Sequence, residues 1–165
     1  MSRRSILVAG AVTVLVAGWY WFRPELAVID RSVSEALADT AGAEILLRGT
    51  FHSNAHATRG TATVYRLPDG RVVARFTGFA TSNGPDVQIY LVAGADVNDR
   101  RDVERGFVSL GALKGNVGDQ NYAVPPEIDL STYRAISVWC RRFAVNFGAA
   151  PLRPPGSHSL FREPA

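Results

Sequence analysis

The chain has 165 residues, a formal net charge of +3 and a single cysteine. Its hydrophobic residues make up 47% of the sequence and are spread along most of it, which excludes global disorder and is enough for one domain with a core. Outside the N-terminal segment, which holds Arg3, Arg4, Arg23 and Glu25, 15 basic and 14 acidic residues remain. A nearly neutral domain without a Lys/Arg stripe gives no electrostatic basis for nucleic-acid binding, so we exclude that class.

The N-terminal segment contains an uncharged run of 17 residues at 6–22, preceded by Arg3 and Arg4. A helix of this length spans about 25 Å, marginal for a hydrocarbon core of about 30 Å, and the aromatic cluster at 19–22 suits the interface. The pattern predicts a transmembrane helix within residues 1–25, with a cytoplasmic N-terminus and an extracytoplasmic C-terminal domain. A cleaved secretory signal is the alternative, and the bulky aromatics near its cleavage position at 17–18 argue against it.

A spacer at 26–43 is expected to follow, with a short helix over 30–41. Ser32 and Glu35 have the spacing of a capping box, and Gly42 supplies a stop. At the other end of the chain, the proline-rich sequence from Pro151 predicts a loose tail, which we place at 153–165.

Between these segments, residues 44–152 have the pattern of strands. The turn at 68–70 and the breaker at 83–85 separate runs rich in β-branched and aromatic residues. The predicted strands are 44–51, 60–67, 71–79, 86–93, 107–110, 121–124, 135–141 and 143–147. About eight short strands without a convincing internal helix predict an all-β fold, either an antiparallel β-sandwich or a small barrel.

The lone cysteine, Cys140, lies in the predicted strand at 135–141. Strand alternation places it on one face with Ile136 and Val138, and Trp139 and Arg141 on the other. A thiol in phase with aliphatic side chains is typical of a small buried hydrophobe. In an exported domain, however, a cysteine without an intramolecular partner is also a candidate redox group or metal ligand. The residues alone leave these interpretations open.

Other candidate sites are weaker. His52 and His56 are surface histidines or, together with a thiolate, candidate ligands of a zinc, copper or haem-type centre. The glycine-rich run at 111–118 lacks the lysine and hydroxyl residue of a phosphate loop, and the acidic residues at 96–102 lack the spacing of a calcium-binding EF-hand and are expected to form a solvated loop. No hydrolase motif is present.

Four blocks of the sequence, taken in order, are similar to the DM13 domain. The blocks lie at 49–60, 79–91, 110–122 and 138–148, and the most specific parts are Gly84-Pro85-Asp86 and the Trp139-Cys140 to Phe147-Gly148 stretch. The resemblance covers residues 44–152. It implies an extracytoplasmic domain with a role in electron transfer, of a kind often found beside DOMON and cytochrome b561 modules.

The resemblance implies that Cys140 is the redox residue, that His56 matches a family histidine, and that Asp86 matches the family's acidic residue. His52 has no counterpart. Because this chain carries neither accompanying module, its electron donor or acceptor would be a separate molecule.

Two functional hypotheses follow. In the first, the domain is a membrane-anchored redox module in which Cys140 reacts or ligates a haem or transition metal. His56 would be a second ligand or a proton partner, supported by Asp86 and Trp139. In the second hypothesis, the domain is a non-catalytic module that binds a protein or ligand of the cell envelope through its loops.

Overall fold

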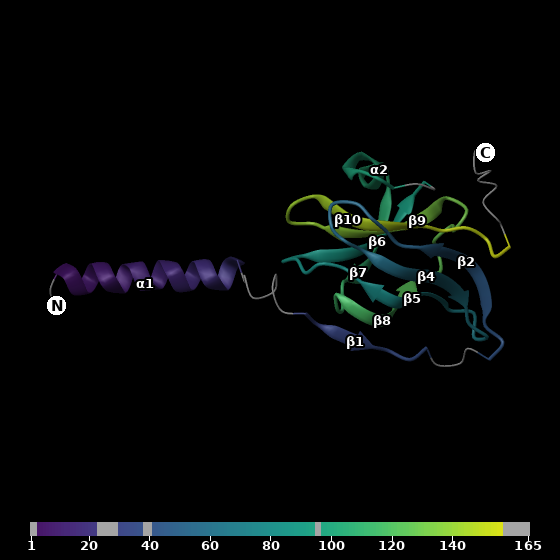
Figure 1. The fold of residues 1–165 in the computed structure, drawn as a ribbon, viewed down its shortest axis with the longest axis horizontal. Helices are drawn as coiled ribbons and strands as arrows, with labels where there is room; N and C mark the ends of the chain where they lie inside the picture. Colours follow the sequence, from purple (N-terminus) through teal and green to yellow (C-terminus); the bar gives the residue numbers. More distant parts are fainter. Residues whose placement is uncertain (1–2, 23–29, 38–40, 95–96, 157–165) are drawn as a thin grey trace, which may run out of the picture.

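The computed structural model describes residues 3–22, 30–37, 41–94 and 97–156, whose strands form a sandwich of two five-stranded sheets (Figure 1). The order in the first sheet is β1-β8-β5-β4-β2 and in the second β3-β10-β9-β6-β7. The elements are α1 (Arg3–Phe22), β1 (Ser32–Ser34), β2 (Glu44–Thr50), β3 (His52–Ser53), β4 (Arg59–Arg66), β5 (Val72–Ala80), β6 (Val87–Ala93), α2 (Arg100–Glu104), β7 (Phe107–Ala112), β8 (Val117–Val124), β9 (Tyr133–Cys140) and β10 (Val145–Pro151). The predicted β-sandwich is therefore confirmed, and the sheets do not close into the alternative small barrel. The strands are antiparallel as expected except for the parallel pair of β1 and β8.

The core lies between the two sheets and follows from strand alternation. On β5, Ala74 and Phe76 are fully buried, whereas Arg75 points to the other face and pairs with Asp119 at 2.8 Å. Phe76 packs against Phe51 and Phe79 with ring centroids 5.0 and 5.3 Å apart. Burying these large side chains between the sheets is the main favourable contribution to folding.

Each of the eight predicted strands has a counterpart. The hairpin between β4 and β5 closes as the sequence indicated, with the Leu67 amide donating to the Arg71 carbonyl at 2.8 Å. The least accurate predictions concern β8 and β10, because β8 begins four residues earlier than expected and β10 extends to Pro151. The expected loose tail is wrong at its start, since Leu152 is buried and Arg153 pairs with Arg48. Residues 157–165 lie outside the described part.

The predicted helix over 30–41 is wrong where the structure describes it. Residues Ser32–Ser34 instead form β1, which pairs in parallel with β8 at the edge of the first sheet. The Glu35 carboxylate accepts hydrogen bonds from the Lys114 ammonium at 2.9 Å and the Asn121 amide at 2.8 Å rather than capping a helix. These tertiary contacts outweigh a weak local helical preference. Residues 32–35 are thus joined to the first sheet, and residues 26–29 and 38–40 of the predicted spacer lie outside the description.

The uncharged N-terminal run forms α1. Within the described residues, however, no helix is long and apolar enough to cross a membrane, so the predicted transmembrane helix is not supported.

A short helix, α2, was not expected from the sequence. The Asp99 side chain caps its N-terminus, and the Asp102 side chain accepts a hydrogen bond from the Asp99 backbone in return, so two of the acidic residues act in a capping box rather than in a solvated loop. Asp96 lies outside the described residues. The helix α2 lies beside the second sheet (Figure 1). Its buried residue Val103 belongs to a second, smaller apolar cluster with Tyr90 and Trp139.

The attachment of β1 depends on Gly118. This residue has a φ of +105°, and a Cβ placed there would lie 2.0 Å from the Val33 carbonyl oxygen. We expect Gly118→Ala to detach β1 and to lower the free energy of unfolding by about 1–3 kcal/mol more than Gly111→Ala. Gly111 is a matched control because its φ is +118° and nothing lies within 4 Å of its Cβ position. Denaturant unfolding measures the difference, and equal effects of the two substitutions would contradict the assignment.

The Glu35 carboxylate makes this attachment sensitive to acid. Burial opposes its ionisation, but hydrogen bonds from Lys114 and Asn121 prevail and lower its pKa below 4.5. Its contribution to stability is therefore complete above pH 4.5 and is lost as the pH falls through the folded-state pKa. We expect Glu35→Gln to lower the free energy of unfolding by about 1 kcal/mol at pH 7, a modest amount because the pair is partly exposed. The loss should be much smaller at pH 3, because protonation of the Glu35 carboxylate then weakens the same contacts in the parent chain. Glu104→Gln, which removes one exposed pair with Arg100 in α2, is the control. A Glu35→Gln deficit that persists undiminished at pH 3 would refute this linkage.

Candidate functional site

The thiol of Cys140 is completely buried, with 0% of the residue exposed to solvent. It faces the main core with Ile136 and Val138, as strand alternation predicted. Cys140 is the last residue of β9, and its partners across the sheet are Val87, the first residue of β6, and Val145, the first residue of β10. The cysteine therefore lies at one end of the sandwich, where three strands begin or end together.

Trp139 lies on the opposite face of β9 from the thiol. It belongs to the smaller cluster on the outside of the second sheet, where its ring stacks near Tyr90 with centroids 6.4 Å apart. Tyr90 in turn stacks on the half-exposed Phe107 at 4.2 Å. The structure thus separates Trp139 from Cys140 by the thickness of the sheet.

His56 follows β3 in a loop that returns along β10. Its ring packs on Phe147 with centroids 3.9 Å apart, and its backbone amide donates to the Phe147 carbonyl. His52 lies within β3 and pairs with Ala149. The two histidines are therefore arranged by strand pairing, not by a helical face.

In the part of the chain that the structure describes, no group of three or more His, Cys, Asp or Glu side chains is positioned to hold a metal ion. Cys140 points into an apolar core, and the His56 ring contacts an aromatic ring. This arrangement does not fit a haem or a transition-metal centre of ordinary coordination. A weaker site with Cys140 and His56 as its two protein ligands stays a prediction.

Asp86 holds the end of β9 in place. Its carboxylate accepts a hydrogen bond from Arg141 at 2.8 Å and one from Gln88 at 2.8 Å, and its carbonyl accepts the Arg141 amide at 2.9 Å. The hydrogen bond to Asp86 also raises the pKa of the Arg141 guanidinium. In the described contacts this carboxylate therefore orients an arginine, whereas the redox hypothesis had Asp86 support His56.

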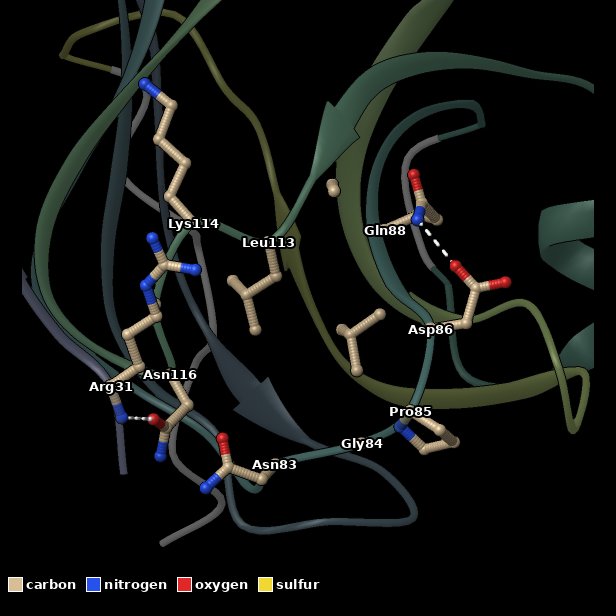
Figure 2. A pocket seen from close by; sticks show the side chains of 12 residues that line it. Arg31, Asn83, Gly84, Pro85, Asp86, Gln88, Leu113, Lys114 and Asn116 are labelled. Atoms are coloured by element: carbon tan, nitrogen blue, oxygen red, sulfur yellow. Dashed lines mark hydrogen bonds between the residues drawn. The ribbon is translucent and has the colours of Figure 1, made fainter. Parts of the chain in front are cut away.

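Beside Asp86, two loops enclose a cleft of about 250 Å³ at the same end of the sandwich. One loop, residues 83–86, leads into β6, and the other, residues 113–116, leads into β8. Figure 2 shows Arg31, Asn83 and Asn116 on one side of the cleft and Asp86 and Gln88 on the other, with Leu113 between them.

Val87, the strand partner of Cys140, is part of the lining. The cleft is thus one strand away from the thiol.

The scan against family models matches the "Electron transfer DM13" family over residues 50–152, which is well over half of the chain. The chain belongs to the DM13 family. No curated protein and no solved structure matches it. The matched region contains β3 to β10, so β1 and the residues before it lie outside the DM13 match.

Two of the sequence blocks that resemble the DM13 domain, at 79–91 and 110–122, form the walls of the cleft. The sequence analysis compared the second block with a phosphate loop and with the DM13 domain, but did not place it beside the first block. One signal of their role as loops was present in the sequence. Gly-Pro-Asp and Leu-Lys-Gly-Asn are both loop sequences, and both flank strands of the same domain. Their spatial proximity depends on the sheet order, which the sequence does not reveal.

A buried polar network shapes the second cleft loop of the DM13 domain. Gln120 is fully buried, donates to the Gly115 carbonyl at 2.9 Å and accepts the Tyr122 hydroxyl at 2.7 Å. Burial raises the pKa of Tyr122, so its hydroxyl stays protonated and able to donate. Because each of these buried groups is paired, the network fixes one loop conformation.

The first cleft loop approaches the core closely at Gly84. A Cβ at this position would lie 2.8 Å from a Val87 methyl carbon and 3.1 Å from the Phe147 ring. Gly84 therefore lets the loop lie against Phe147, whose ring also contacts His56. Together with the Asp86–Arg141 pair, this contact closes the end of the sandwich over Cys140.

The geometry makes a direct prediction about thiol reactivity. We expect native Cys140 to react with a thiol reagent many times more slowly than the same residue in denaturant, because reaction requires the end of β9 to open. The exposed variant Ser109→Cys in a Cys140→Ala background is the control and should react at once when native. Rapid native labelling of Cys140 itself would show that the thiol is accessible and the closed arrangement wrong.

Proposed function

We propose that this DM13 protein is an electron-transfer module that acts with a separate redox partner and uses Cys140 as its redox group. Family membership supports electron transfer as the general role. One observation carries the residue-level proposal: Cys140, Asp86 and both cleft loops lie at the same end of the sandwich, and Val87 belongs both to the cleft wall and to the strand pair of the cysteine.

The reaction proposed for Cys140 is thiol–disulfide exchange with that partner. The Cys140 thiolate attacks a disulfide of the partner, forming a mixed disulfide and releasing the partner's other sulfur as a thiolate. The dithiol of a second, reducing partner then attacks the Cys140 sulfur, which releases the first partner's remaining sulfur as a thiolate, and its second thiol displaces Cys140. Two electrons thus pass from that dithiol to the first partner's disulfide, and Cys140 returns to its reduced form. No internal disulfide is involved, because the chain has one cysteine.

Such exchange requires local opening, since the closed thiol has no exposed surface. The opening needed is small. Cys140 pairs with the first residues of β6 and β10, so separating the ends of three strands exposes it without unfolding the sandwich. Docking of a partner at the cleft would favour this opening by moving the loop that carries Gly84 and Asp86.

A location outside the cytoplasm, with residues 6–22 in contact with a membrane, belongs to the same proposal. It is supported by the two arginines that precede the uncharged run. Disulfide exchange also suits a compartment in which disulfides persist.

Thiol trapping in the host cell tests the proposal. Cells are quenched with acid, separated into cytosolic, membrane and exported fractions, and alkylated, and Cys140 is then assayed by mass spectrometry. We expect a reductant-sensitive mixed disulfide outside the cytosolic fraction, absent from Cys140→Ala. A Cys140 that stays reduced under both oxidising and reducing growth would refute the redox role, and protein confined to the cytosol would refute the location.

The complete burial of Cys140 specifically favours a second candidate, the non-catalytic binding module. In that case the cysteine is a core residue, and the cleft loops capture an envelope protein or ligand. The same trapping experiment separates the two candidates when partner capture is measured in parallel. A binding module loses capture in Asn83→Ala and Lys114→Ala and keeps it in Cys140→Ser, whereas the redox module loses its covalent complex in Cys140→Ser.

A further inference from the structure

The cleft is completed by two residues outside the DM13 match. Asp30 and Arg31 precede β1, which pairs with β8. The Asp30 carboxylate accepts hydrogen bonds from the side-chain amides of Asn83 at 3.2 Å and Asn116 at 2.8 Å, and the Arg31 backbone amide donates to the Asn116 side chain at 2.7 Å. Residues 30 and 31 thus tie the two cleft loops together.

The same connection places the Arg31 guanidinium in the lining of the cleft (Figure 2). Among the residues that the structure describes, Arg31 forms no ion pair. Lys114, the other cation of the lining, has its ammonium held by Glu35 at 2.9 Å and by the Asn121 carbonyl at 2.6 Å. Arg31 is therefore the lining cation that remains able to bind a ligand.

The two carboxylates at the cleft are already engaged. Asp86 is bound by Arg141 and Gln88, and Asp30 is bound by the amides of Asn83 and Asn116. Their negative charges nevertheless disfavour a multiply charged anion such as phosphate more than a singly charged one. The electrostatics select a ligand with a single negative charge.

The rest of the lining is apolar and small. Pro85, Val87 and Leu113 contribute hydrophobic surface, and the volume of about 250 Å³ lies below the range of about 300–1,000 Å³ typical of sites for drug-sized molecules. A guanidinium binds a carboxylate through two parallel hydrogen bonds, a geometry that it shares with no other side chain. We propose that the cleft is a binding site for a small monocarboxylate with an apolar body, and that Arg31 binds its carboxylate.

This site goes beyond the electron-transfer proposal and involves no redox step. Its failure and the failure of the redox proposal are distinguishable, since ligand binding is measured on reduced protein without any thiol reagent. Carboxylate binding by a protein whose Cys140 is inert would support the cleft proposal and refute the redox proposal. A redox-active Cys140 in a protein that binds no carboxylate would do the opposite.

Benzoate and benzamide are suitable probes because they share a shape and differ in charge. Titration of the full chain followed by NMR should show benzoate binding with shifts in residues 83–86 and 113–116, and benzamide binding at least ten-fold more weakly. Inorganic phosphate, titrated in the same way, should also bind more weakly than benzoate. Absence of saturable benzoate binding at these residues would overturn the proposal, as would equal affinity for benzamide or tighter binding of phosphate.

The role of Arg31 is tested by substitution. We expect Arg31→Gln to weaken benzoate binding about ten- to hundred-fold, through loss of charge-assisted hydrogen bonds. Arg31→Lys should recover only part of this loss because an ammonium lacks the two-pronged geometry. Arg59→Gln, at an exposed arginine of β4 outside the cleft lining, should bind like the parent chain. Unchanged affinity in Arg31→Gln would overturn the assignment even if benzoate binds.

Discussion

The packing of the two sheets against each other is the constraint on which the rest of the molecule depends. Phe51, Phe76 and Phe79 meet edge to face or tilted at 5.0–5.3 Å in its centre, and such contacts are satisfied only when the sheets keep their spacing and register. Cys140 is part of this core because β9 is a central strand of the second sheet. Its burial is thus a consequence of the fold, independent of any chemistry that the thiol performs.

The cleft exists because the sandwich ends there. Strands can fill the space between the sheets along their length, but at their ends only loops are available, and loops need specific polar contacts to stay in place. Gln120 supplies these contacts from within the core and Asp30 from outside it. Residues 30–34 are therefore a structural part of the domain. A variant that begins at residue 50 would lose both Asp30 and Arg31.

The sequence predicted strands well where burial on one face dictates alternation, as for Ala74 and Phe76 or for Val138 and Cys140. It failed where a distant partner decides the conformation. Nothing in the sequence near Ser32 shows that Gly118 leaves room for a parallel strand, and the Ser32–Glu35 spacing locally favours a helix. For the candidate site, the sequence proposed Cys140, His56 and Asp86, and their functional roles stay predictions. It missed Arg31 and the meeting of the two loops, because these depend on sheet order.

The position of Cys140 limits the routes by which it could exchange electrons. The thiol has no exposed surface in the closed core, so a partner's sulfur reaches it only after the structure opens. Opening at this position involves strand ends, which separate at lower free energy than the middle of a sheet. The contacts that resist this opening, the Asp86–Arg141 pair and the packing of Gly84 on Phe147, belong to the loop that borders the cleft. We therefore expect a ligand that moves this loop to change access to the thiol, because the same contacts border the cleft and cover the end of β9.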